Sequence, residues 1–171
     1  VAISEPQAGS DAGSMTTSAE VEDGTVTING SKLWVSKVEA CGAFLVYAKF
    51  PDGNVGAVVV DKDADGFEVG EAYTNMAGHE QHELIFDDCA VPEEQILVQG
   101  KDSFKELLIE FNVERCHNAM MCVTCGLNAF DKALEHAKNR EQFDQPIADF
   151  QGIEGKIADM AMKLDAARLL I

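Results

Sequence analysis

This chain of 171 residues has few basic residues and no long apolar run. Its 13 Lys and Arg stand against 30 Asp and Glu, so its formal net charge is −17. A phosphate backbone or an anionic membrane surface would repel such a chain unless a basic patch compensated, and we expect no nucleic-acid partner. No apolar run approaches the roughly 20 residues that span a bilayer, and the first residues lack the features of a signal peptide. We therefore expect a globular protein without membrane insertion.

A disulfide framework and a metal site are also missing from the sequence. The five cysteines are an odd number without regular spacing, which predicts a reducing compartment and hence the cytoplasm. Cys122 and Cys125 have redox spacing, but they lie inside an apolar helical pattern that favours buried structural thiols. His79 and His82 have no further ligands at metal-site spacing, and we expect no metal.

The first half of the chain has the pattern of β-structure. Between residues 15 and 98, short runs rich in β-forming residues alternate with turn dipeptides. The runs cover residues 25–28, 44–48, 55–60 and 67–69. The dipeptides Asp23-Gly24, Asn29-Gly30 and Asp52-Gly53 are typical of hairpins and turns. This half is predicted to form an antiparallel β-barrel or sandwich.

The second half has helical periodicity. From residue 102 onward, apolar residues recur every three or four positions until a loop around residues 144–146, and a second such pattern continues to the end. The fold class is therefore α+β by segments. We expect a β domain in residues 1–100, followed in residues 101–171 by two long antiparallel helices of an incomplete bundle. Their apolar faces need partners from later helices or another subunit.

Two short motifs favour a flat ligand that carries phosphate. Residues 4–11 read Ser-Glu-Pro-Gln-Ala-Gly-Ser-Asp, and Trp34-Val35-Ser36 follows about two dozen residues later. Glycine and alanine next to serine let main-chain N–H groups approach phosphate oxygens closely, while an indole offers a broad apolar face to a conjugated ring. The combination suits a dinucleotide such as FAD.

In this order and spacing, the motifs resemble those of the acyl-CoA dehydrogenase family. The resemblance continues through Glu-Leu-Ile-Phe-Asp-Asp-Cys-Ala-Val-Pro at residues 83–92, Glu114-Arg115, residues 139–143 and Phe150-Gln151. This chain departs from the family pattern at Gln7 and at Asp144, where the family usually has Gly. The resemblance implies the family's middle β domain and the start of its C-terminal helical domain.

The resemblance also implies roles for individual residues. Ser4 would contact the pyrimidine edge of FAD, Ser36 would bond near its N5 atom, and Trp34 would pack against the isoalloxazine. The full set of residues implied to bind FAD is Ile3, Ser4, Gly9, Ser10, Trp34, Val35, Ser36, Arg140, Gln142 and Gln151, of which the last three would serve a neighbouring subunit. Ser10, Asn112, Glu114 and Arg115 would contact the acyl-CoA substrate.

Glu114 is the candidate catalytic base for the Cα proton. A carboxylate with an ordinary pKa of roughly 4.3 is a poor base, so Glu114 would need burial and loss of water. In the family, the base stands either at this helix position or in a later loop, which would lie beyond Ile171. A Glu that pairs with a neighbouring cation on a surface is the structural alternative.

We expect the chain to be a fragment, because it begins without Met inside the loop that the resemblance makes a binding loop. The complete enzyme would act in fatty acid metabolism, oxidising an acyl-CoA to the 2,3-enoyl form as a homo-oligomer, either a tetramer or a dimer. It would pass its electrons to an electron-transferring flavoprotein. Three alternatives stay open: an enoyl-CoA reductase, an acyl-CoA oxidase, and a catalytically silent β-domain that serves as an interaction module.

Overall fold

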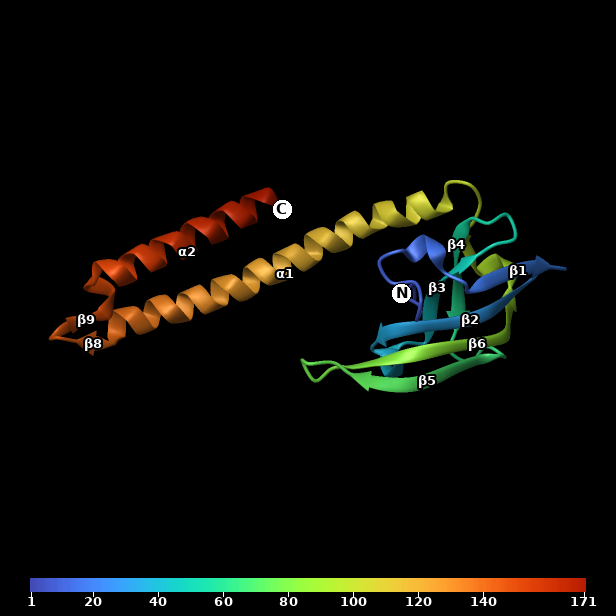
Figure 1. The fold of residues 1–171 in the computed structure, drawn as a ribbon, viewed down its shortest axis with the longest axis horizontal. Helices are drawn as coiled ribbons and strands as arrows, with labels where there is room; N and C mark the ends of the chain where they lie inside the picture. The colour runs from blue at the N-terminus through green and yellow to red at the C-terminus, as the bar shows by residue number, and fades with distance from the viewer. The chain divides into compact units, whose positions relative to one another are not determined.

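The computed structural model describes all residues 1–171 and divides them into two compact units, Val1–Leu108 and Ile109–Ile171. The first unit contains the main sheet, and the second is mainly helical (Figure 1). The predicted domain boundary between residues 100 and 101 stays a prediction.

One seven-stranded sheet forms the first unit (Figure 1). Its strands are β1 (Ser18–Glu22), β2 (Thr25–Ser36), β3 (Ala43–Lys49), β4 (Val55–Asp61), β5 (Phe67–Thr74), β6 (Glu80–Pro92) and β7 (Ile96–Val98). Their order is β5-β6-β2-β1-β3-β4-β7, and all neighbours are antiparallel except β1 and β3, which pair in parallel. The predicted antiparallel β half is confirmed.

The hydrophobic core lies on one face of this sheet, the face to which Val26 and Ile28 of β2 point. Val26 and Ile28 alternate with less buried residues along β2, as expected for a strand with one buried face. Ala2 belongs to the same core and forms a parallel bridge with β3. Its N–H donates to the Leu45 carbonyl at 2.8 Å, and its carbonyl accepts the Tyr47 N–H at 3.0 Å. The first residues are therefore fixed to the sheet.

Two of the three predicted turns are present. Asp23 and Gly24 connect β1 to β2, and both have left-handed backbone, with φ of 50° and 79°. Two successive left-handed residues match the twist of a tight hairpin. Gly53, with φ of 80°, lies in the turn between β3 and β4.

The third prediction, that Asn29-Gly30 separates two strands, is wrong. Both residues lie inside β2, at an irregularity in its pairing with β6. The Asn29 amide donates to the Asp88 carboxylate at 3.0 Å, and its oxygen accepts the Asp88 N–H at 2.8 Å. These long-range bonds keep the chain extended at Asn29-Gly30, so it forms no turn. The extra residue of the β-bulge lies on β6, where Asp87 and Asp88 stand opposite Asn29.

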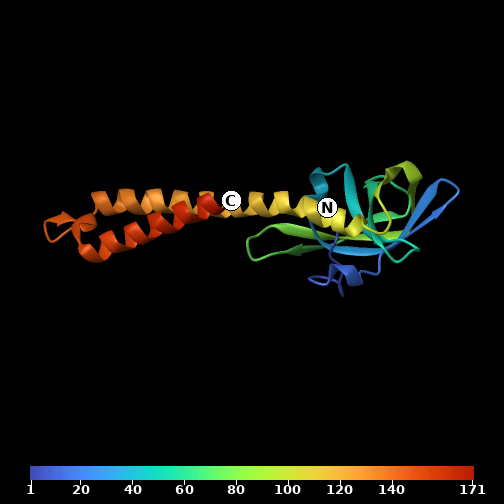
Figure 2. The same cartoon turned by 90° about the horizontal axis from the view of Figure 1, so that it is seen from above.

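The two predicted helices are confirmed as α1 (Ser103–Asn139) and α2 (Gln151–Leu170). Within the second unit, α2 folds back beside the C-terminal part of α1 in both views (Figures 1 and 2). The helices approach closely at Gly126, where an added Cβ would lie 2.7 Å from Leu164 Cδ2. Neither helix combines the length and the apolar character that crossing a membrane requires.

The prediction that Cys122 and Cys125 are buried is wrong. Both lie in α1, but both are exposed. The covered stripe of α1 in this region contains Val123, Gly126 and Leu127, and the two cysteines fall outside it. A helix buries one face at a period of 3.6 residues, and an apolar composition alone does not place a thiol on that face.

We expect Gly30→Ala to destabilise the first unit. Gly30 has φ of 140°, and an added Cβ would lie 2.6 Å from Thr17 Oγ1 and 2.7 Å from Thr17 Cα. Strain and overpacking together should lower the free energy of unfolding by about 2 kcal/mol or more, measured by denaturant unfolding. Gly42→Ala is the matched control, since nothing lies within 4 Å of its Cβ position. Equal stability of both variants would contradict this account.

Candidate functional site

Two segments of the first unit bring predicted ligand-binding residues together. The Ser4 carbonyl accepts the N–H of Leu33 at 2.8 Å, so the loop of residues 4–11 lies against the part of β2 that carries Trp34. Ser4 is half-buried, whereas Gly9 and Ser10 are exposed in the loop that leads to the short helix η1 (Ala12–Ser14). The structure thus joins motifs that are about two dozen residues apart in the sequence.

A buried ion pair fixes this loop to β2. Lys32 Nζ lies 2.7 Å from Glu5 Oε1, and the two side chains are 0% and 1% exposed. The Glu5 carboxylate also accepts the N–H groups of Thr16 and Thr17 at 2.7 and 3.0 Å. Lys32 Nζ donates in addition to the Ile3 carbonyl at 3.1 Å. A buried charge is tolerated when it is paired and hydrogen-bonded, and both conditions hold here.

These contacts keep Glu5 ionised. Burial alone would raise the pKa of the Glu5 carboxyl, but the hydrogen bonds from Lys32, Thr16 and Thr17 outweigh it and lower the pKa to about 2. Donors to the charged form of a carboxyl favour that form. The pair therefore stays charged at neutral pH.

Gln7, one of the two departures from the family pattern, takes part in the same cluster. Its amide nitrogen lies 2.6 Å from Glu5 Oε2 and 2.7 Å from Thr16 Oγ1. Gln7 does not have positive φ, so the backbone does not require glycine at this position. The substitution adds a donor to the Glu5 carboxylate.

Trp34 lies in a strained β-bulge of β2. Its φ is 63°, and the pairing of β2 with β6 shifts register between Lys32 and Val35. Lys32 and Val35 are both buried although they are three residues apart, and in a regular strand they would face opposite sides. The bulge resolves this conflict, and it leaves Trp34 52% exposed and Ser36 exposed as well. A left-handed conformation for so large a residue is a genuine outlier and often marks a functional site.

Neighbouring strands hold the bulge in place through two residues that sequence reasoning missed. Gln81 of β6 pairs with Ser36 and Tyr73 in register, and its Nε2 lies 3.2 Å from the Trp34 carbonyl oxygen. The Tyr73 ring lies 5.2 Å from the Trp34 ring between centroids, at 58°. No local sequence signal marks these residues, because strand register alone brings them to the site.

Two of the predicted ligand residues are wholly or partly covered by the protein. Val35 is 4% exposed and belongs to the core cluster, and Ile3 is half-buried. Any contact of Val35 with a ligand would have to come from its main chain. The predicted contacts of both residues stay predictions.

Asn112, Glu114 and Arg115 lie close together on α1 in the second unit, and all three are exposed. The Arg115 guanidinium donates to the Asn112 side-chain oxygen at 2.7 Å, one helical turn away. Glu114 takes part in none of the ion pairs of the chain. The surface pairing of Glu114 with a cation, which was the structural alternative, is therefore not formed within this chain.

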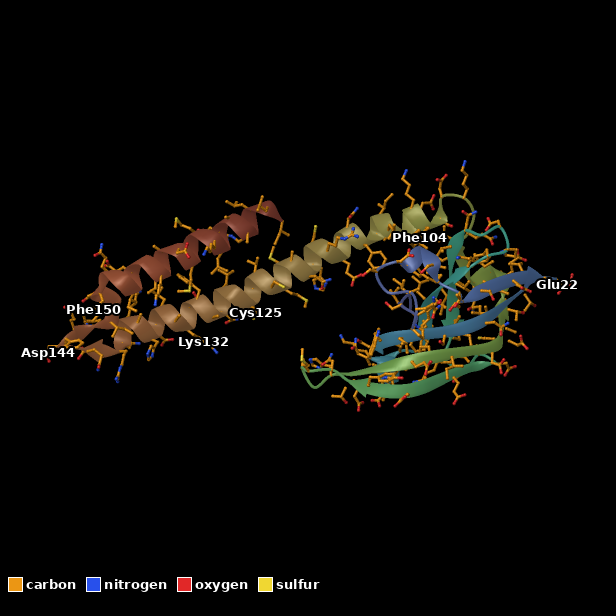
Figure 3. All side chains as sticks on the ribbon, viewed as in Figure 1. Glu22, Phe104, Cys125, Lys132, Asp144 and Phe150 are labelled. Carbon is orange, nitrogen blue, oxygen red and sulfur yellow. The ribbon has the colours of Figure 1, made fainter.

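The connection between α1 and α2 gathers Arg140, Gln142 and Gln151. Arg140 follows α1, Gln142 lies in β8 (Glu141–Gln142), and Gln151 begins α2. Strands β8 and β9 (Gln145–Pro146) form a tight hairpin, followed by the short helix η4 (Ile147–Asp149). Figure 3 shows Asp144 at the tip of this hairpin and Phe150 at its base. All three predicted ligand residues are exposed at this corner.

The hairpin also accounts for the second departure from the family pattern. Phe143 and Asp144 form its two-residue tip, with φ of 56° and 61°. Glycine adopts this conformation without strain, and Asp is among the few other residues that tolerate it. Asp144 can therefore replace Gly without a change of turn type.

His79 and His82 are not joined by further metal-ligating side chains. His79 lies in the turn before β6, and His82 lies within β6 with a buried Nδ1 atom that has no hydrogen-bond partner. No group of three or more His, Cys, Asp or Glu side chains is placed to hold a metal ion.

Comparison with known proteins covers both units. The family profile described as "Acyl-CoA dehydrogenase, middle domain" matches residues 1–89, and the profile "Acyl-CoA dehydrogenase, C-terminal domain" matches residues 104–171. The chain is 38% identical over 176 residues to an acyl-CoA dehydrogenase of Bacillus subtilis, covering 99% of this chain and 46% of that protein. It is 35% identical, with the same coverage, to caffeyl-CoA reductase-Etf complex subunit CarC of Acetobacterium woodii.

Solved structures of the same family are also similar to this chain. The butyryl-CoA dehydrogenase of Megasphaera elsdenii superposes with a TM-score of 0.89 at 31% identity, covering 99% of this chain and 46% of that one. The chain therefore spans about half the length of the relatives it matches.

We expect Glu5→Gln to destabilise the first unit strongly. The substitution keeps the size of the side chain but leaves the buried Lys32 ammonium without its counter-charge. Removing one partner of a buried pair costs about 3–5 kcal/mol, which denaturant unfolding would detect. Glu20→Gln, at an exposed residue of β1, is the matched control and should change stability by less than about 0.5 kcal/mol.

The same pair predicts a dependence on pH. Because the pKa of folded Glu5 is about 2, below its ordinary 4.5, the pair stabilises the fold above pH 4.5 and loses this effect as the pH falls toward 2. The difference in stability between wild type and Glu5→Gln should narrow over that range. A difference that stays constant from pH 6 to pH 2 would show that the charge of Glu5 does not stabilise the loop.

Proposed function

Because this chain belongs to the acyl-CoA dehydrogenase family, we propose that its protein oxidises an acyl-CoA thioester to the 2,3-enoyl form with FAD. One observation carries the proposal. Trp34, in a left-handed bulge of β2, is 52% exposed, and the Ser4 loop lies against the same strand. The strained backbone of β2 exposes an indole beside the Ser4 loop, and an exposed indole is a platform on which a flat ring can stack.

The residues at this platform fit FAD. Trp34 offers an apolar face to the isoalloxazine, and Ser36 and Ser4 are hydroxyl donors on the two segments beside it. Gly9 and Ser10 form an exposed stretch of loop whose main chain can approach phosphate, since nothing lies within 4 Å of the Cβ position of Gly9. The bound flavin would supply the hydride acceptor, and the protein would supply orientation and donors for the arriving charge.

The second unit would supply the acid–base chemistry. We propose that Glu114 takes the Cα proton while the Cβ hydrogen leaves as hydride, so that the Cα–Cβ double bond forms. Asn112 and Arg115 would line the path of the acyl chain, and Ser10 would contact the CoA portion of the substrate. Glu114 is exposed in this chain, and substrate would have to displace water from it to make it an effective base.

Assembly would complete the cofactor site. Arg140, Gln142 and Gln151 lie together at one exposed corner, which suits contact with an FAD held by a neighbouring subunit of a homotetramer or dimer. The planar guanidinium of Arg140 can form two hydrogen bonds with a pyrophosphate. An electron-transferring flavoprotein is the proposed electron acceptor, in keeping with the relative named as a subunit of a reductase-Etf complex.

The reverse reaction, reduction of an enoyl-CoA, is the second candidate. The relative from Acetobacterium woodii is named a caffeyl-CoA reductase subunit and is 35% identical to this chain. Anaerobic titration of the flavin in the full-length protein, with an acyl-CoA and then with an enoyl-CoA plus reductant, would separate the two directions.

We expect Trp34→Ala to lower the FAD content of the full-length protein. The substitution removes a stacking face worth up to about 1.5 kcal/mol beyond its area, or about tenfold in affinity. Flavin absorbance per protein measures occupancy, and Trp34→Phe, which keeps an aromatic face, should retain more flavin. Wild-type protein that purifies without flavin and takes none up on addition would refute the proposed cofactor.

We expect Glu114→Gln to slow acyl-CoA-dependent flavin reduction by about 10²-fold or more, while substrate still binds. Stopped-flow absorbance measures the rate in full-length protein. Glu110→Gln, an exposed Glu one helical turn earlier, is the matched control and should reduce its flavin at close to the wild-type rate. If Glu114→Gln also behaves like wild type, the base lies elsewhere.

A further inference from the structure

We propose that Gln81 is a positioning residue for the flavin site, which directs the Ser36 hydroxyl outward as a hydrogen-bond donor. This inference rests on the proposed flavin function. Gln81 lies on β6, outside the two ligand-binding motifs of residues 4–11 and 34–36.

The identity of the Gln81 atom that faces Ser36 follows from its neighbours. The same side-chain atom lies 3.2 Å from the Trp34 carbonyl oxygen and 3.4 Å from Ser36 Oγ. A carbonyl oxygen can only accept, so this atom must be the amide nitrogen. An amide nitrogen can only donate, and Ser36 Oγ must therefore accept from it.

This polarity sets the direction of the Ser36 proton. A hydroxyl that accepts from Gln81 cannot also point its own proton at that nitrogen. The Ser36 hydroxyl makes no other hydrogen bond within the chain, and Ser36 is exposed. Its proton is thus left for a ligand on the outer face, where an acceptor such as a ring nitrogen of the proposed flavin would receive it.

Gln81 also stabilises the strained residue next to Ser36. Trp34 keeps its left-handed φ of 63° while its carbonyl oxygen accepts from Gln81. Strained backbone persists only where surrounding contacts fix it. Gln81 itself is held in place because its β6 position pairs with Ser36 on β2 and with Tyr73 on β5. One amide therefore connects the indole platform and the hydroxyl donor.

The test is a double-mutant cycle in full-length protein with Gln81→Met, Ser36→Ala and both together. Gln81→Met keeps the length of the side chain and removes its donors. We expect it to weaken FAD binding by about threefold to tenfold, in the range of a lost hydrogen bond. The loss should be clearly smaller in the Ser36→Ala background, because residues that act through one another are not additive. FAD dissociation constants come from flavin fluorescence.

A second readout separates positioning from mere stability. A donor near N5 stabilises charge arriving on the ring, so its loss should make the midpoint potential of the bound flavin more negative. Gln81→Met and Ser36→Ala should both shift the potential in this direction. Gln81→Leu, which also lacks donors and adds no charge, should reproduce the shift if Gln81→Met folds poorly. Gln95→Met is the matched control, since Gln95 donates only to Asp61 at 3.1 Å.

Two outcomes would overturn the inference and leave the proposed function intact. One is an unchanged potential and affinity in Gln81→Met and Gln81→Leu variants that still hold flavin. The other is full additivity of Gln81→Met with Ser36→Ala. A wild-type protein that binds no FAD would instead refute the proposed function, and the inference with it.

Discussion

The buried Glu5–Lys32 pair is the interaction on which the candidate site depends. The loop of residues 4–11 has no regular strand or helix of its own, and it could take many paths over the sheet. A buried carboxylate needs a cation and several donors, and the observed placement of the loop brings Lys32, Thr16 and Thr17 to Glu5 at once. That placement also brings the Ser4 carbonyl to the N–H of Leu33. The electrostatic requirement of one carboxylate thus sets the position of the ligand loop.

Lys32 links this requirement to the shape of β2. Its side chain must face inward to reach Glu5, and Val35 must face inward to join the core. The three-residue separation cannot satisfy both in a regular strand, so the bulge and the left-handed Trp34 follow. Conformations of this kind cost about 1–3 kcal/mol, which the surrounding contacts must offset. The exposed indole is therefore a consequence of how the ion pair and the core share one strand.

The sequence predicts most of the fold, because periodicity and turn residues are local properties. The two helices, the antiparallel β half and the Asp23-Gly24 hairpin are all confirmed. The failures involve long-range partners. Asn29-Gly30 has a hairpin signal, yet bonds between Asn29 and Asp88, 59 residues away in the sequence, keep it extended. The motifs identify Ser4, Trp34 and Ser36, but Gln81 and Tyr73 reach the site only through strand register, which no local pattern records.

The contacts that position the proposed ring site all lie within Val1–Leu108. Glu5, Lys32, Tyr73 and Gln81 belong to this unit, whereas the candidate base and the Arg140 corner belong to Ile109–Ile171. The platform for the ring is therefore built without help from the residues that would perform the acid–base chemistry. Such a separation lets the position of the base change without rebuilding the platform. The platform contacts would therefore be the same whether the base is Glu114, as we propose, or a residue outside this chain.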